Sequence, residues 1–144
     1  MFRRLAFAAL ALIVLTCAGF TALASAAPHK VYLERDIVGQ ELAYRPHAIG
    51  LSADGTFAII GISYRSYGGP VATATAQAYV RGCTPNCAEG KEYRAPATLS
   101  FGKKIQCRGV TIYSQLRYAL RGPLPSGFRR RGTEPLRPVA EKGC

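Results

Sequence analysis

The chain has 144 residues, a formal net charge of +11 and 49% hydrophobic residues. This length favours a single domain, and the hydrophobic content excludes a disordered polyelectrolyte. The excess of lysine and arginine is compatible with an anionic partner, but equally with a solvated basic surface that keeps a small protein soluble, and it predicts no reaction.

The amino-terminal segment has the features of a secretory signal peptide. Two arginines precede an unbroken apolar run at residues 5–15, and Ala24 and Ala26 form the small-x-small pattern that signal peptidase cuts. We therefore predict a signal peptide over residues 1–26 and a secreted, extracellular protein. The alternatives are a membrane-spanning anchor and a lipoprotein that is lipid-anchored at Cys17.

The segment 27–121 is predicted to be a β domain because its apolar residues recur with period two. In residues 71–81 alanines alternate with threonines and other polar residues, so one face is predicted to be buried and the other exposed to solvent. Residues 110–120 repeat this pattern. Shorter strands are expected at 30–33, 48–51, 56–64 and 97–101, with a hairpin turn at Asp54-Gly55.

These strands predict an all-β fold, a small antiparallel β-sandwich or barrel of about six or seven strands. Phe57 to Ile62 is continuously apolar and is expected to be a central strand, and Gly102 to Lys104 is expected to turn the chain. Residues 122–144 are rich in proline, glycine and arginine and predict a tail that does not easily continue the sheet.

Four cysteines follow the predicted signal peptide: Cys83, Cys87, Cys107 and Cys144. Export favours two disulfides over free thiols. Four cysteines allow three pairings, of which we favour Cys83 with Cys87 and Cys107 with Cys144. A zinc site is not expected, because the spacings lack paired C-x-x-C knuckles.

No catalytic motif is recognisable. The candidate general bases are His29 and His47, and no nucleophile elbow accompanies a triad of His47 with Asp54 and a nearby serine. Gly68-Gly69 lacks the Lys-Ser/Thr that follows in a phosphate loop. We therefore predict a protein that is not an enzyme and needs no metal or other cofactor.

Tyrosines that neighbour arginines are the candidate binding residues, because aromatic rings stack on sugars and arginines bind anionic groups. This set is Tyr64, Arg65, Tyr67, Arg81 and Arg117. Cross-strand packing is the alternative interpretation of the rings. In a regular strand Tyr64 and Tyr67 would point to opposite faces, so a turn at Arg65-Ser66 is needed to bring them together.

Three stretches carry a resemblance to a known group of proteins. They are residues 48–55, which end in Asp-Gly, residues 61–68, with an aromatic-x-x-aromatic-Gly segment, and residues 83–90, with Cys-x-Pro-x-Cys-Ala-x-Gly. The chain resembles uncharacterised small secreted proteins of actinobacteria, but has Tyr64 and Tyr67 where tryptophan is expected. The resemblance implies export, disulfides and a β fold, and it carries no reaction.

Two functions are compatible with these features. The first is a secreted, monomeric β module that binds an anionic or carbohydrate component of the cell envelope, a polymer or lipid head groups; nucleic acid is not expected outside the cell. The alternative is an extracellular protease inhibitor, in which a Cys83–Cys87 ring stiffens an exposed loop. Arg81, Lys91 and Arg94 would then suit a trypsin-like protease.

Overall fold

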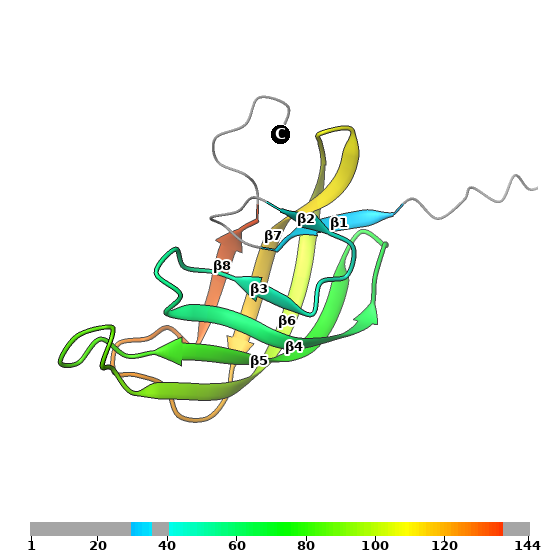
Figure 1. Ribbon diagram of the computed structural model, residues 1–144. Coiled ribbons are helices and arrows are strands. Elements are labelled where there is room, and N and C mark those ends of the chain that lie inside the picture. Colours follow the sequence, from blue (N-terminus) through cyan, green and yellow to red (C-terminus); the bar gives the residue numbers. More distant parts are fainter. Residues whose placement is uncertain (1–29, 36–40, 137–144) are drawn as a thin grey trace, which may run out of the picture.

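The computed structural model describes residues 30–35 and 41–136, and their regular structure is β-strand. Eight strands form one sheet in the order β2-β1-β7-β6-β5-β4-β3, and β8 also pairs with β7 (Figure 1). They are β1 (Val31–Glu34), β2 (Leu42–Ala43), β3 (Ala48–Gly50), β4 (Phe57–Ser66), β5 (Ala72–Arg81), β6 (Glu92–Cys107), β7 (Val110–Leu120) and β8 (Arg131–Pro135). The described residues contain no helix of the length and apolarity that a membrane span requires.

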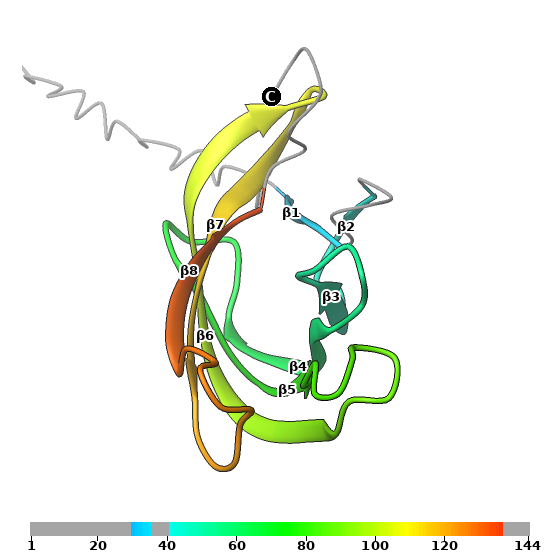
Figure 2. The same ribbon diagram turned by 90° about the vertical axis from the view of Figure 1, so that its left-hand side faces the viewer.

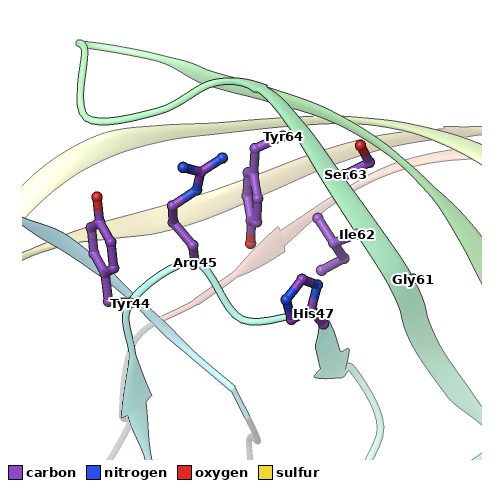
Figure 3. A pocket seen from close by; sticks show the side chains of 7 residues that line it. All are labelled: Tyr44, Arg45, His47, Gly61, Ile62, Ser63 and Tyr64. Carbon is purple, nitrogen blue, oxygen red and sulfur yellow. The ribbon is translucent and has the colours of Figure 1, made fainter.

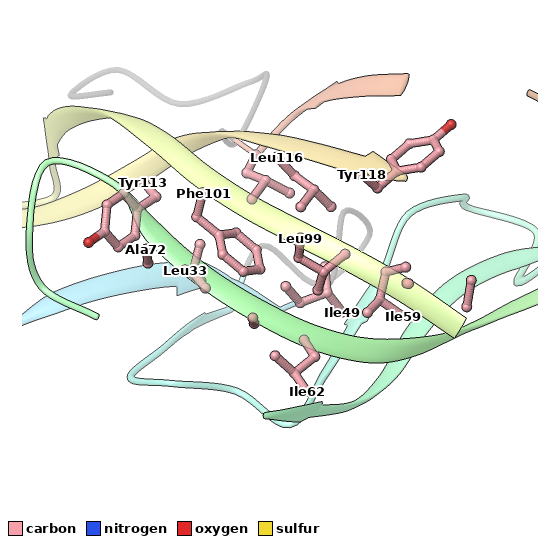
Figure 4. Packing of buried hydrophobic residues seen from close by; sticks show 14 of the residues in the cluster. Leu33, Ile49, Ile59, Ile62, Ala72, Leu99, Phe101, Tyr113, Leu116 and Tyr118 are labelled. Carbon is pink, nitrogen blue, oxygen red and sulfur yellow. The ribbon is translucent and has the colours of Figure 1, made fainter. Parts of the chain in front are cut away.

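The long strands β4 to β7 form an antiparallel meander that carries the core on one face. In β5 the alternation predicted from the sequence is confirmed, since Ala72, Ala74 and Ala78 are buried and Thr73 and Gln77 are exposed. Small methyl groups leave room above them, and larger side chains fill that room. Figure 4 shows these side chains, which include Phe101, Leu99 and Leu116.

The sheet curls so strongly that its two ends approach each other and form a half-barrel (Figure 2). Leu33 of β1 and Ile49 of β3 are fully buried in the same core, although their strands stand at opposite ends of the strand order. The main-chain nitrogen of Gly50 donates a hydrogen bond of 3.0 Å to the carbonyl oxygen of Arg35. This bond joins β3 to the end of β1.

The predicted all-β class is confirmed, with one difference in strand direction. Strand β1 pairs with β7 in parallel, through Val31 with Thr111 and Tyr32 with Ile112. The sheet is therefore mixed rather than purely antiparallel. The apolar strand that begins at Phe57 is an interior strand, because it pairs with β3 on one side and with β5 on the other.

The predicted hairpin turn at Asp54-Gly55 is confirmed. Gly55 has a φ of 71°, and the Asp54 carboxylate accepts hydrogen bonds from the Thr56 nitrogen at 3.1 Å and the Thr56 hydroxyl at 2.7 Å. Glycine adopts this left-handed conformation without a steric cost. The bond to the Thr56 hydroxyl is the main cause that lowers the pKa of Asp54.

A turn at Gly102 to Lys104 was expected, and this expectation is wrong. Strand β6 continues to Cys107, and the chain reverses at Arg108 and Gly109, whose φ values of 52° and 75° are both positive. Two positive φ angles are the requirement of the tight hairpin turn whose twist matches the flanking strands. Beyond the end of β5, β6 stays paired with β7, and β1 joins β7 there at Thr111 and Ile112.

The expectation that residues 122–144 do not continue the sheet is also wrong for the described part of that segment. Residues 131–135 form β8, which pairs antiparallel with β7 from Ala119 to Gln115. Proline is compatible with this position because β8 is an edge strand, where one side of the backbone needs no partner. Pro123 and Pro125 lie in the loop before the strand.

Part of the disulfide prediction is confirmed. Cys83 and Cys87 form a disulfide in the exposed loop between β5 and β6. Cys107 is also disulfide-bonded, and its predicted partner, Cys144, lies outside the described residues. The predicted signal peptide, with Cys17, lies outside them too.

Candidate functional site

The predicted binding residues do not form one site. Tyr64 lies on the core face of β4, opposite Ala74 of β5, whereas Arg65 lines a hollow that is floored by Thr73 and Ser100. Arg117 of β7 lines the same hollow. The structure therefore groups the tyrosines at one place and two of the arginines at another.

A cavity of about 680 Å³ opens beside the edge of β4, and we call it the tyrosine–arginine pocket (Figure 3). Its lining consists of Tyr44, Arg45, His47, Gly61, Ile62, Ser63 and Tyr64. The pocket exists because β3 is much shorter than β4. The Ile62 nitrogen still donates a hydrogen bond of 3.0 Å to the His47 carbonyl. Beyond Ile62, β4 has no main-chain partner from the described chain on this side.

Behind the pocket, aromatic rings pack edge to face in a continuous cluster. The ring centroids of Tyr64 and Tyr67 are 4.8 Å apart, and Tyr67 also meets Tyr44 and Tyr113 at 5.6 Å each. Tyr64 and Tyr67 thus meet, although β4 runs through Arg65 and Ser66 without the turn that was expected to bring them together. A shift of register between Tyr64 and Ser66 produces this contact, because an extra residue in the strand changes which face the next side chain joins.

Arg45 is the central residue of the pocket. Its guanidinium carbon lies 5.4 Å from the Tyr64 ring centroid and 5.7 Å from that of Tyr67, which is within the range of cation–π attraction. Figure 3 shows its side chain between Tyr44 and Tyr64. Among residues 30–35 and 41–136, no carboxylate lies within ion-pair distance of this guanidinium.

The backbone of Arg45 is in the left-handed region, with a φ of 52°. Residues other than glycine adopt this region at an energetic cost, and surrounding contacts have to hold them there. Two such contacts come from the tyrosines. The Tyr64 hydroxyl donates to the Pro46 carbonyl at 2.9 Å, and the Arg45 nitrogen donates to the Tyr67 hydroxyl oxygen at 3.4 Å.

Burial raises the pKa of Tyr64 well above the usual value for tyrosine and raises the pKa of Tyr67 to about 12. For Tyr64 the neighbouring Tyr67 adds to this increase, whereas Arg45 opposes it. Both hydroxyls are therefore neutral at physiological pH. The net charge at the centre of the pocket comes from the Arg45 guanidinium.

A second candidate surface crosses the outer face of the sheet, and we call it the convex groove. It consists of two adjoining hollows of about 460 Å³ and 150 Å³ that share Ser100 and Arg117. Arg65 lines one hollow and Lys103 lines the other, and no carboxylate lines either of them. Its floor carries the hydroxyls of Thr73, Thr98 and Ser100, which belong to the outer face of β5 and β6.

Arg81 belongs to neither surface. Its guanidinium donates to the Tyr79 hydroxyl at 2.7 Å and forms an ion pair with Glu92. Hydrogen bonds from Tyr79 and then from Arg81 lower the pKa of Glu92. Of the three residues named for the inhibitor alternative, Arg81 and Arg94 lie within strands β5 and β6, whereas Lys91 is exposed in the loop between these strands.

Sequence reasoning did not include Arg45 and Tyr44 among the candidate binding residues. The rings that hold Arg45 lie about twenty residues away along the chain, and no local pattern connects them. Across the described ranges, no group of three histidine, cysteine or acidic side chains is placed to hold a metal ion. Comparison with known proteins found no matching family, no matching curated protein and no matching solved structure.

Proposed function

We propose that this protein is a secreted, non-catalytic β module that binds an acidic carbohydrate of the cell envelope through its tyrosine–arginine pocket. The observation that supports this most is the Arg45 guanidinium. It is held over two tyrosine rings and has no carboxylate partner in the described part of the chain. An arginine in this condition is available to a carboxylate of a ligand.

The carboxylate of the ligand is expected to bind the Arg45 guanidinium. Arginine presents a planar set of donors that matches the two oxygens of a carboxylate. The ring stack already restricts the side chain, so less conformational entropy is lost on binding. A ligand carboxylate would also compensate a charge that has no partner there.

The sugar ring is expected to rest against Tyr44. The Tyr44 side chain is 50% exposed, and it lines the pocket together with His47 and Ser63, which supply a ring nitrogen and a hydroxyl for hydrogen bonds. The volume of the pocket lies within the range of roughly 300–1,000 Å³ that is usual for small-ligand sites. An apolar ring face beside a few polar groups suits a carbohydrate.

The charge of the whole protein supports the same class of ligand. With a formal net charge of +11, the protein attracts polyanions at long range and repels cationic partners. Salt screens such attraction. Binding that depends on Arg45 contact and on overall charge should therefore weaken as ionic strength rises, without losing its preference for carboxylate over neutral sugar.

The test is calorimetric titration with a short uronic-acid oligosaccharide and with its carboxyl-reduced, neutral analogue. The variant is Arg45→Gln, and the matched control is Arg121→Gln, which removes one charge from an exposed arginine that lines neither surface. We expect wild type and control to bind the acidic oligosaccharide alike, and Arg45→Gln to bind about tenfold or more weakly. Equal binding of the neutral analogue, or unchanged binding by Arg45→Gln, would contradict the proposal.

A further inference from the structure

The convex groove has the features of a second anion site, separate from the tyrosine–arginine pocket. Arg65, Lys103 and Arg117 line it without any carboxylate, and no ion pair with a described residue involves any of the three. Three cations that have no acidic partner repel one another, and a polyanion relieves that repulsion. The hydroxyls of the groove floor add hydrogen-bond donors between them.

The chemistry of the groove differs from that of the pocket. Thr73, Thr98 and Ser100 stand on neighbouring strands in register, so their hydroxyls form a regular polar floor. Among the residues that line the groove, the aromatic one is Tyr118, which is largely buried. Such a surface contacts the charged groups of a polymer without selecting one sugar, as cationic surfaces do with other polyanions.

The two surfaces belong to different faces of the same sheet. Strand β4 contributes to both, because Tyr64 faces the core side and its neighbour Arg65 lines the groove. From Arg65 the groove runs across β5 and β6 to Arg117 on β7, and then to Lys103. It therefore leads away from the edge of β4, where the pocket opens.

From this arrangement we propose that the protein is bivalent: the convex groove binds a second chain of the acidic polymer, so that one molecule cross-bridges two chains. This inference rests on the proposed function for the first chain and adds a role that binding alone does not require. Two sites of modest affinity on one sheet connect two polymer chains. Further protein molecules bound along the same chains add further connections.

Light scattering of a long acidic polysaccharide, titrated with the protein, tests the bridging. We expect scattering to rise, to reach a maximum, and to fall when excess protein gives every chain its own occupant. A short oligosaccharide should bind without scattering. Binding of the short ligand reports on the proposed function, whereas scattering reports on the bridge, so the two can fail separately.

The decisive variants are Arg65→Gln/Arg117→Gln in the groove and Arg45→Gln in the pocket. Each should still sediment with the long polymer but lose most of the scattering increase. The control, Arg94→Gln/Arg121→Gln, removes the same charge as the groove variant from outside both surfaces and should scatter like wild type.

Three results would overturn the bridge. The first is wild-type protein that binds the long polymer without scattering, as happens when one chain wraps round β4 into both surfaces. The second is a groove variant that scatters like wild type. The third is a control variant that loses scattering as the groove variant does, because net charge would then be the cause.

Discussion

The main-chain nitrogen of Arg45 donates a hydrogen bond to the Tyr67 hydroxyl oxygen, and the Arg45 guanidinium lies over the ring of the same tyrosine. One tyrosine thus holds both the backbone and the charge of the residue that is central to the pocket. The backbone there is left-handed, with a φ of 52°. Substitutions of Arg45 can therefore test the effect of its backbone conformation separately from the effect of its charge.

The strain at Arg45 predicts an unusual order of stability. Arg45→Gly and Arg45→Ala both lose the cation–π contacts, but glycine adopts a φ of 52° without the steric cost that alanine has. We expect Arg45→Gly to be more stable than Arg45→Ala by about 1 kcal/mol, measured by urea unfolding. Two variants of equal stability, or the reverse order, would show that the backbone is not strained in solution.

The hydroxyl of Tyr113 is predicted to stabilise the loop that follows β4. It donates to the Gly69 carbonyl at 2.8 Å and accepts from the Gly68 nitrogen at 3.0 Å, and the side chain is fully buried. Tyr113→Phe should lower the free energy of unfolding by about 1–3 kcal/mol, because the half-buried Gly68 nitrogen and Gly69 carbonyl lose their partner. Tyr93→Phe is the control, and it should change stability by less than about 0.5 kcal/mol.

The buried tyrosines predict a loss of stability at alkaline pH. The pKa of Tyr67 is about 12 in the folded protein and that of Tyr113 is also raised, mainly by burial, whereas an unfolded tyrosine ionises near the usual value of 10.0. A raised folded pKa gives a contribution that is complete below pH 10 and is lost as the pH rises through the folded value.

Absorbance of tyrosinate, followed together with circular dichroism, measures this effect. We expect the buried tyrosines, Tyr67 and Tyr113 among them, to ionise only at a pH well above 10, together with the loss of the sheet. If all eight tyrosines of the chain ionised in one step near pH 10 without unfolding, the burial of the cluster would be refuted.

Gly132 is predicted to be essential for the attachment of β8. A Cβ atom at this position would lie 2.4 Å from the Tyr118 hydroxyl oxygen and 2.5 Å from the ring carbon that carries it, so the Tyr118 side chain would have to move. Gly132→Ala should destabilise the protein by about 1–3 kcal/mol, measured by thermal unfolding. Gly102→Ala is the matched control on β6, because a Cβ there meets nothing within 4 Å. An equal effect of both substitutions would count against the packing of Tyr118 on β8.

The part of the fold that was predictable is the part that local pattern determines. Alternation in residues 71–81 gave the buried alanine face of β5, and the segment predicted at 110–120 coincides with β7. Asp54-Gly55 marked a true turn because its requirement for a positive φ is local. A strand with one face on the core and the other in solvent alternates apolar and polar residues, so its own sequence is enough to predict it.

Other features depend on contacts that are distant in sequence. Tyr113 belongs to the polar row of its strand, yet it is buried because Gly68 and Gly69 bind its hydroxyl. Strand β8 escapes prediction because proline and glycine argue against a strand unless its edge position is known. Only two of the five predicted binding residues, Arg65 and Arg117, line one surface together, and Arg45 acquires its role from rings on another hairpin.

The hydrogen bond from Gly50 to Arg35 joins β3, at one end of the strand order, to the end of β1, which lies next to the strand at the other end. The long strands β4 to β7, by contrast, are joined by ladders of many paired residues. We therefore expect local opening to begin at the contact between Gly50 and Arg35, so that Leu33 and Ile49 become accessible to water before the long strands separate. The part of the core around Leu33 and Ile49 should therefore exchange its amide hydrogens faster than the part beneath the long strands.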